Sequence, residues 1–230
     1  EIRLSLVGSE MCIRDRTTTT QGIIAALKKA GLRVLLAAPT GRAAKRMSEA
    51  TGMEAKTIHR LLEYNPQDGY KRNDENPLEG DALIVDECSM IDILLMNNLL
   101  KAVPVGMRLV LVGDIDQLPS VGAGNVLRDV IDSQRIPVVR LVRIFRQAQK
   151  SRIVMSAHAI NRGKFPDTSN GRDTDFFFMK EEDPERAAES IVRLVKERLP
   201  RAYRESPDRI QVLTPCLLYT SDAADDSLRV

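Results

Sequence analysis

The sequence has 230 residues, a formal net charge of +2 and 43% hydrophobic residues, which is typical of a globular protein and excludes disordered and fibrous classes. No apolar run approaches the roughly 18 residues of a membrane-spanning helix, and no secretory signal is evident, so we expect neither a membrane nor a secreted protein. With so small a net charge, any contact with nucleic acid must depend on local basic clusters.

Both ends differ from the sequence between them. Residues 4–16 and 216–230 resemble translated sequencing-adaptor read-through and do not continue the neighbouring periodicity, so we expect no part of the fold from them. The body at 17–215 then has 34−4=30 basic and 32−6=26 acidic residues, a net charge of +4. Its single cysteine, Cys88, excludes a disulfide or zinc framework and fits a reducing cytoplasm.

The first helical pattern covers residues 17–30 and stops at Gly31. It starts with four threonines, which are poor in a helix interior because their branched side chains lose freedom there. They suit a helix N-terminus, where hydroxyl groups and free amides can meet an anion. A polar cap explains the threonine run equally well.

A predicted buried strand at 33–38 ends at a turn, Pro39-Thr40-Gly41-Arg42, and a helix follows at 42–51. A helix N-terminus with hydroxyl and cationic groups is a good phosphate contact, although solvated cations are the plain alternative. A short helix at 57–62 carries His59. The polar stretch after it permits a small hairpin at Asp68-Gly69.

The acidic pair at the centre of the sequence follows a short apolar run. Leu83-Ile84-Val85 is typical of a buried strand, and Asp86-Glu87 comes directly after it. Open α/β sheets bind ligands at the carboxyl ends of their strands. There one carboxylate can hold Mg²⁺ and the next can polarise the water that attacks a γ-phosphate. Helix capping by Asp86 or Ser89 is the alternative for this pair taken alone.

A helix at 89–103 separates this strand from another at 107–112, which brings Gly113-Asp114-Ile115-Asp116-Gln117 to the same edge. The amide of Gln117 can hydrogen-bond a phosphate oxygen and a backbone group together, so it could report the state of a nucleotide. Strands that alternate with helices predict an α/β fold with a parallel sheet and right-handed crossovers. The remaining predicted elements are helices at 122–132, 151–162 and 184–199 and strands at 136–142, 175–179 and 209–213.

The strand at 175–179 contains three consecutive phenylalanines and is expected in a core, with a base-stacking platform as the alternative.

The order of these segments resembles the RecD/TraA family of superfamily 1 DNA helicases, which includes RecD-like ATP-dependent helicases and the alpha subunit of exodeoxyribonuclease V. The resemblance covers most of 17–215. It implies an ATP-dependent DNA helicase of recombination and repair that travels 5′→3′ on single strands, unwinds duplex DNA and uses ATP and Mg²⁺. It leaves membership of a helicase–nuclease complex open. The matching segments are TTTT, APTGRAAKRM, TIHRLL, LIVDECSMID, LVLVGDIDQLPSVGAGNVLRD and IFRQA with SRIVMSAHAINRG.

The same resemblance implies a P-loop NTPase fold in which two RecA-like domains grip ATP between them. The implied organisation is a foreign end at 1–16, a first motor domain 1A at 17–146 with a small 1B hairpin near 64–80, a partial second motor domain 2A at 147–215, and a foreign end at 216–230.

Roles follow from the resemblance, residue by residue. Thr17 falls on the P-loop hydroxyl ligand of Mg²⁺, with Thr18 beside it at the nucleotide. Asp86 falls on the metal-associated acid and Glu87 on the catalytic base. Gln117 matches the γ-phosphate sensor, and Arg146 matches the arginine that neutralises charge on the transferring phosphoryl group. The implied contacts with single-stranded DNA are Pro39, Thr40, Gly41, Arg42 and His59.

The sequence departs from the family at the P-loop, which reads Gly-x-x-Gly-x-Gly-Lys-Thr. Residues 11–16 contain no glycine that could form a nest of backbone amides for phosphate, and Arg16 stands where the lysine belongs. The strand that precedes the P-loop is also expected to be absent. We therefore expect an interior fragment, without ATP turnover, of an active motor. The alternatives are another P-loop enzyme, such as a nucleotide kinase, and a non-catalytic DNA-binding or partner-docking module.

Overall fold

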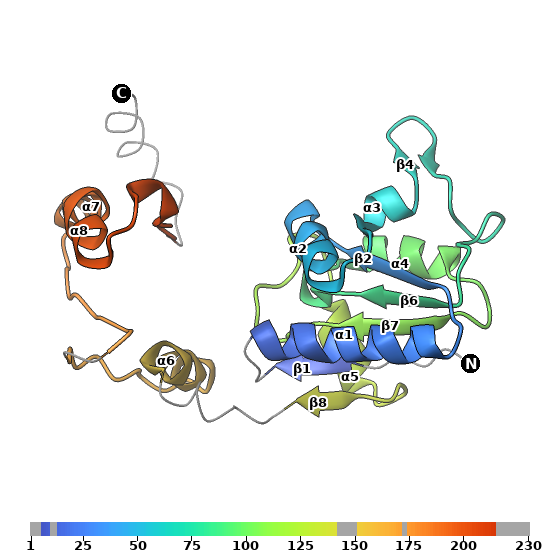
Figure 1. The fold of residues 1–230 in the computed structure, drawn as a ribbon, viewed down its shortest axis with the longest axis horizontal. Coiled ribbons are helices and arrows are strands. Elements are labelled where there is room, and N and C mark those ends of the chain that lie inside the picture. Colours follow the sequence, from blue (N-terminus) through green and yellow to red (C-terminus); the bar gives the residue numbers. More distant parts are fainter. Residues whose placement is uncertain (1–5, 10–12, 142–150, 172–173, 215–230) are drawn as a thin grey trace. The chain divides into compact units, whose positions relative to one another are not determined.

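The computed structural model describes residues 6–9, 13–141, 151–171 and 174–214 (Figure 1). The chain forms two compact units, Glu1–Asp167 and Thr168–Val230. The division into motor domains at residue 146 stays a prediction. Within the described residues, no helix is both long and apolar enough to cross a bilayer.

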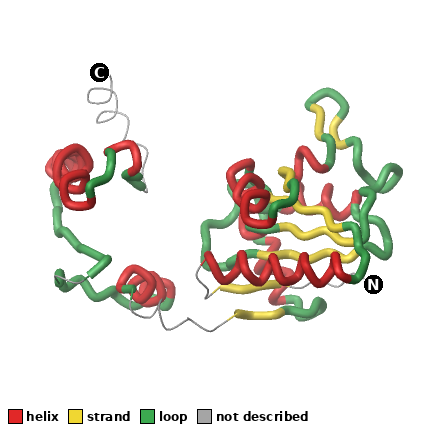
Figure 2. Tube along the Cα trace, in the orientation of Figure 1, coloured by secondary structure: helices red, strands yellow, loops and turns green. Residues whose placement is uncertain are grey.

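A parallel sheet forms the centre of the first unit (Figure 1, Figure 2). Its six strands have the order β3-β2-β6-β7-β1-β8, and the neighbours run parallel, which confirms the predicted α/β class. Parallel neighbours need a crossover connection, which helices supply here. In chain order the strands are β1 (Leu6–Ser9), β2 (Val34–Ala38), β3 (Ala55–Thr57), β6 (Ala82–Val85), β7 (Arg108–Val112) and β8 (Val139–Leu141).

The expectation that no strand precedes the threonine run is wrong. Strand β1 lies between β7 and β8, with Leu6 opposite Leu111 and Gly8 opposite Arg140. Without β1, the facing edges of β7 and β8 would each carry a row of unpaired backbone groups, and one short extended segment satisfies both rows. Part of the N-terminal stretch excluded from the fold on its sequence therefore completes the sheet.

Helix α1 (Ile13–Lys29) also begins earlier than predicted. The sequence has neither glycine nor proline between Ile13 and Thr17, so nothing stops the helix from extending toward its N-terminus. Thr17 and Thr18 lie in the second turn, beyond the first four residues whose amides are free, and the prediction that they open the helix is wrong. The other end agrees with the prediction, because Gly31 follows the helix with φ +76°.

Helices cover both faces of the sheet. One face packs against α1 and α2 (Gly41–Thr51), and the other packs against α3 (Ile58–Leu61), α4 (Ile93–Ala102) and α5 (Val126–Asp132). Successive strand residues alternate between the two faces. The first layer receives Ala82, Ile84, Val110 and Val112, the second receives Leu83, Val85, Leu109 and Leu111, and each of these side chains is at most 6% exposed.

The polar excursion after α3 forms the predicted hairpin. Strands β4 (Tyr64–Asn65) and β5 (Gly69–Tyr70) are antiparallel, and Tyr64 lies opposite Tyr70. Gly69 has φ +77°, which is why a glycine suits this position of the turn.

Beyond the sheet, α6 (Arg152–Asn161) begins at Ser151, whose hydroxyl accepts from the Val154 N–H at 3.3 Å. In the second unit, the predicted helix at 184–199 is confirmed and extends further. It comprises α7 (Pro184–Arg193), the π-helical segment η3 (Leu194–Arg198) and α8 (Leu199–Tyr203).

Two strands predicted for the second unit are wrong. Residues 174–183 contain no strand, and Phe177 and Phe178 are 53% and 44% exposed. A strand needs a neighbour to pair with. Instead, the backbone of Phe178 hydrogen-bonds to the side chain of Asn170. The Asn170 side-chain amide donates to the Phe178 carbonyl at 2.9 Å and accepts from the Phe178 N–H at 3.0 Å. The stretch predicted as a strand at 209–213 begins at the end of a 3₁₀ turn, Pro207–Arg209, and continues without strand structure.

Candidate functional site

The carboxyl ends of three neighbouring strands bring the predicted site segments to one edge of the sheet. Ala37 of β2 lies opposite Val85 of β6, which lies opposite Leu111 of β7. The residues that follow these strands are therefore neighbours in space, as the sequence predicts. They are Pro39–Arg42 after β2, Asp86–Glu87 after β6 and Gly113–Gln117 after β7.

The acidic pair is held by backbone contacts at this edge. The Asp86 N–H donates to the Ala37 carbonyl at 3.0 Å, which extends the ladder one residue beyond β6. Oδ1 of Asp86 accepts from the Glu87 N–H at 2.8 Å. Glu87 has φ 53°, in the left-handed region that non-glycine residues rarely adopt. Backbone strain of this kind concentrates at functional sites. The pair therefore occupies a strained turn directly beyond the strand.

A cation from the neighbouring helix faces the second carboxylate. Nη1 of Arg46, on α2, lies 4.0 Å from Oε1 of Glu87. The Arg46 side chain is 60% exposed and the Glu87 side chain 25%, so water screens this ion pair and its stabilisation is small. Glu87 can therefore exchange this partner for another at little cost.

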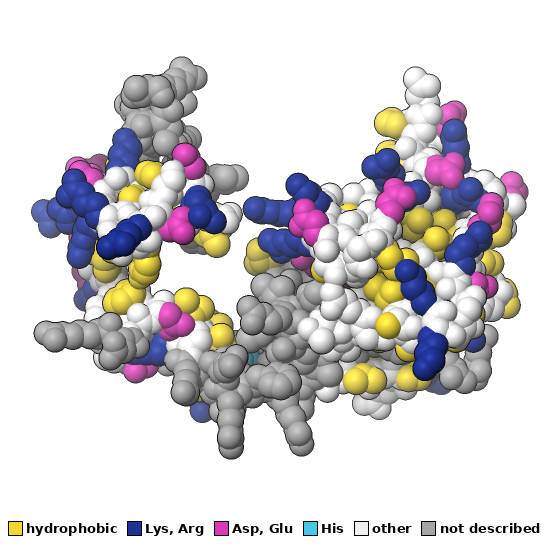
Figure 3. All heavy atoms as spheres, viewed as in Figure 1, with side chains coloured by type: hydrophobic (Ala, Val, Ile, Leu, Met, Phe, Trp, Pro, Cys, Tyr) yellow, Lys and Arg dark blue, Asp and Glu magenta, His cyan; other side chains and the backbone are white. Residues whose placement is uncertain are grey.

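The turn after β2 begins a capped helix with an exposed basic face. The Thr40 hydroxyl accepts from the Ala43 N–H at 3.2 Å and so caps α2, which confirms the predicted turn and helix. Arg42 and Lys45 are exposed. Lys and Arg side chains gather over this part of the unit in the space-filling view (Figure 3). The turn therefore offers positive charge beside the acidic pair.

Gln117 lies in a tight turn after β7. Its N–H donates to the Asp114 carbonyl at 3.2 Å, and Oδ1 of Asp114 accepts from the Asp116 N–H at 3.0 Å. The Gln117 side chain is exposed at the same edge as Asp86. Arg146 lies outside the described residues, so its role stays a prediction.

Cys88 is buried and His59 is exposed, so only His59 is accessible to a ligand. The Cys88 thiol is buried and donates to the Val85 carbonyl at 3.2 Å, and burial raises the pKa of this thiol, so it is a core group and not a nucleophile. His59 is exposed on α3, which starts where β3 ends.

The acidic turn at this edge is compatible with a magnesium–nucleotide complex. No cluster of three or more His, Cys, Asp and Glu side chains able to hold a metal occurs among the described residues. Mg²⁺ bound with a nucleotide takes only one or two carboxylates, with phosphates and water completing its shell, and Asp86 can supply one. The role of Thr17 as a ligand stays a prediction.

Gly113 brings the end of β7 against the turn that contains the acidic pair. A Cβ at this position would lie 2.7 Å from Cδ2 of Leu127, 3.2 Å from the Cys88 nitrogen and 3.3 Å from the Ser89 nitrogen. The sequence signal for this close approach is a glycine directly after a buried strand.

We expect Gly113→Ala to lower the free energy of unfolding by about 1–3 kcal/mol, because the added methyl displaces Leu127 or the turn. Urea unfolding of the two proteins measures the difference. Gly22→Ala is the matched control, since a Cβ at Gly22 meets nothing within 4 Å and alanine favours the helix that contains it. Equal stability of Gly113→Ala and the parent chain would contradict the close approach.

Comparison with known proteins gives one consistent family. A family model described as an AAA domain matches residues 15–123. The ATP-dependent RecD2 DNA helicase of Deinococcus radiodurans is 41% identical over 200 residues, which are 87% of this chain and 26% of that protein. The RecBCD enzyme subunit RecD of Mycobacterium tuberculosis is 39% identical over 149 residues, which are 57% of this chain and 26% of that protein.

Among solved structures, Bacteroides Pif1 bound to ssDNA has a TM-score of 0.49 and 20% identity, over 72% of this chain and 44% of that one. The chain spans about a quarter of the length of the curated relatives it matches. The match to RecD2 over 87% of this chain confirms the sequence resemblance. The chain belongs to the RecD-like family of superfamily 1 DNA helicases.

Proposed function

We propose that the protein to which this chain belongs is an ATP-driven DNA helicase, and that the described edge of the sheet is its nucleotide side. The observation that carries the proposal is the strained acidic turn at Asp86 and Glu87, flanked by the basic start of α2 and by the Gln117 turn. The family gives this arrangement its chemistry, since RecD2 of Deinococcus radiodurans is an ATP-dependent DNA helicase.

In this proposal each side chain at the edge has one task. Asp86 would hold Mg²⁺, which would supply positive charge to the phosphates of bound ATP. Glu87 orients the attacking water and accepts its proton. Gln117 hydrogen-bonds the γ-phosphate oxygen and so distinguishes ATP from the product. Arg146, which lies outside the described residues, is proposed from the resemblance to neutralise charge on the phosphoryl group.

The basic turn and His59 are the proposed contacts with single-stranded DNA. Backbone amides at the start of α2 and the side chains of Thr40 and Arg42 would bind phosphates without reading sequence. Duplex unwinding with 5′→3′ travel, and assembly with nuclease subunits, are further parts of the proposal suggested by the RecD relatives. A cytoplasmic location is part of it too, because a DNA motor works where the DNA is.

The chain as written is proposed to bind DNA without turning over ATP. Residues 10–16 contain no glycine and no lysine, so the amide nest that holds phosphates in a P-loop is missing, and Arg16 stands in place of its lysine. Thr17 in the interior of α1 agrees with this conclusion. A non-catalytic DNA-binding module is therefore the function proposed for this polypeptide, beside the motor proposed for its family. ATP turnover by the chain above that of Glu87→Gln would contradict the proposal.

The basic turn can be tested through its dependence on salt. We expect Arg42→Ala to weaken binding of an oligothymidylate of about 12 nucleotides roughly three- to tenfold, and to reduce the slope of log affinity against log salt by about 0.7, since one phosphate contact is lost. Fluorescence anisotropy at several salt concentrations measures both.

Lys101→Ala is the matched control for Arg42→Ala. Lys101 is exposed in the last turn of α4, which lies at the amino ends of the strands, because the Leu78 N–H donates to the Ala102 carbonyl just before β6. Removing this charge changes the net charge equally but leaves the proposed site untouched. No binding by the parent chain at low salt, or equal losses in both variants, would contradict the proposed DNA contact.

A further inference from the structure

Three aromatic rings meet where α3 joins the hairpin. The ring centroids of Tyr64 and Tyr70 are 4.8 Å apart, and the His59 ring lies 5.7 Å from Tyr64 and 6.1 Å from Tyr70. Tyr70 packs against the core of the first unit, and burial raises the pKa of its hydroxyl. Tyr64 instead stays 47% exposed, and His59 is exposed as well. The cluster therefore has one ring anchored in the core and two facing solvent.

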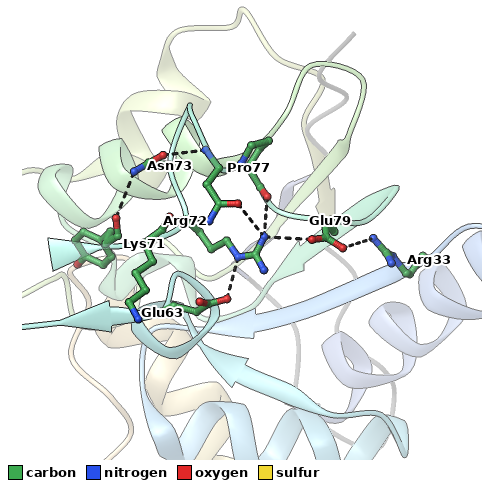
Figure 4. Close-up of polar contacts among 9 residues, drawn as sticks. Arg33, Glu63, Lys71, Arg72, Asn73, Pro77 and Glu79 are labelled. Atoms are coloured by element: carbon green, nitrogen blue, oxygen red, sulfur yellow. Dashed lines mark hydrogen bonds and ion pairs between the residues drawn. The ribbon is translucent and has the colours of Figure 1, made fainter. Parts of the chain in front are cut away.

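Arg72 fixes the stem of this hairpin. Its guanidinium donates to Oε1 of Glu63 at 2.9 Å, to the Pro77 carbonyl at 3.1 Å and to Oε1 of Glu79 at 3.4 Å, and Glu79 also pairs with Arg33 at 3.9 Å (Figure 4). The hydrogen bond from Arg72 holds the pKa of the Glu63 carboxyl below its usual value.

Two strands of two residues are not stable by themselves, so these contacts, together with the bond from the Arg72 N–H to the Leu62 carbonyl at 3.1 Å, set the position of the hairpin on the sheet. The exposed rings are therefore held in place before any ligand arrives. A preorganised aromatic face loses little entropy when a flat ligand stacks on it.

Several basic side chains lie near the rings. Lys56 and Lys71 both lie near enough to the hairpin stem to lower the pKa of Glu63, and Arg60 is exposed one residue after His59. Thr57 lies opposite Ala38 in the register of β3 and β2, so His59 follows the same edge that presents Arg42. The helix that carries His59 thus starts at the same edge of the sheet as the basic turn proposed to hold DNA phosphates.

We propose that Tyr64, Tyr70 and His59 form a stacking site for a nucleobase of single-stranded nucleic acid. Aromatic rings beside a cationic track are the chemistry that single strands require, because every base has a π-face and every linkage carries a charge. A ring that served only to staple the hairpin would be covered, whereas Tyr64 keeps nearly half of its surface open. The inference rests on the proposed DNA binding and names the part of the strand that this surface contacts.

Two strands of equal length, one oligothymidylate and one abasic, separate stacking from phosphate binding. We expect Tyr64→Ala to weaken binding of the oligothymidylate about fivefold to 30-fold, with its salt slope unchanged, because no charge is lost. Affinity for the abasic strand should stay the same. Tyr64→Phe should bind as the parent does, since the ring remains.

A second readout reports the base itself. An oligonucleotide that carries 2-aminopurine should lose fluorescence on binding to the parent chain, through stacking on the rings, and lose less on binding to Tyr64→Ala. Tyr203→Ala is the matched control, because Tyr203 is 63% exposed on α8 and belongs to the second unit. Thermal unfolding of each variant verifies that the hairpin change leaves the fold intact.

The outcomes distinguish this inference from the function on which it rests. If neither strand binds the parent chain, the DNA contact itself is wrong. If both strands bind and Tyr64→Ala weakens them equally, or not at all, DNA binding stands and the stacking site is overturned. The stacking site is established if Tyr64→Ala loses affinity for the oligothymidylate but not for the abasic strand, and if the quenching of 2-aminopurine depends on the Tyr64 ring.

Discussion

Restoring the glycine pattern ahead of Thr17 is expected to tighten the binding of Mg–ATP at least about 100-fold. Four substitutions produce Gly-x-x-Gly-x-Gly-Lys-Thr in register with Thr17. They are Glu10→Gly, Ile13→Gly, Asp15→Gly and Arg16→Lys. The new glycines would allow successive amides to point at phosphate, and the lysine would replace the Arg16 guanidinium with a compact ammonium group. Hydrogen bonds to charged groups contribute about 1.5–3 kcal/mol each, so two of them already account for the expected gain.

The same substitutions should also move the start of α1. Glycine at positions 13 and 15 disfavours the first turn of the helix, which has no other stop signal before Thr17. A helix that starts near Thr17 would place its free amides and positive end beside the acidic turn. The expected gain therefore comes from backbone geometry more than from the lysine alone.

Calorimetric titration with Mg–ATP measures this prediction, and two variants control it. Arg16→Lys alone should bind ATP no more than about threefold more tightly than the parent, because it adds no new amide contact or net charge. Asp86→Asn in the restored background should remove the dependence on Mg²⁺, since its carboxylate is the proposed ligand. Unchanged ATP affinity in the fourfold variant would show that this edge of the sheet is not a nucleotide site.

The buried strands and the acidic edge could be predicted from the sequence because their signals are local. Strands buried on both faces are continuous apolar runs, so 33–38 and 107–112 match β2 (Val34–Ala38) and β7 (Arg108–Val112) closely. Strand β1 could not be predicted, because four residues in a stretch without periodicity carry no strand signal of their own. They form a strand because they can pair with β7 on one side and β8 on the other. The phenylalanines at 176–178 predict burial by composition alone, but burial needs a covering partner.

The sequence predicts which segments of the candidate site meet, because each of them directly follows a strand of the sheet. The contact between Arg46 and Glu87 depends on how α2 is rotated over the sheet, which no sequence pattern fixes. Tyr64 and Tyr70 gave a usable signal that the sequence interpretation missed. They lie symmetrically on either side of the turn that contains Asp68-Gly69, so a hairpin register there places them opposite each other.

Leu111→Ala is expected to lower the free energy of unfolding of the first unit by about 2–5 kcal/mol. Leu111 is 1% exposed on β7 and belongs to the cluster that joins α3, α4 and α5 to the sheet. The lost side chain leaves a cavity that the flanking strands cannot close, because β7 is hydrogen-bonded to a strand on each side. An effect of this size is a large fraction of the stability of an ordinary domain.

Unfolding in urea, followed by circular dichroism, measures the loss, with Val105→Ala as the matched control. Val105 is fully exposed in the connection before β7, so removing its branches should change the free energy of unfolding by no more than about 0.5 kcal/mol. Leu111 also lies two residues before Gly113, where β7 supports the turn of Glu87. The cavity should therefore speed hydrogen exchange at the Cys88 and Ser89 amides, and equal stability of the two variants would mean that this strand is not the centre of the core.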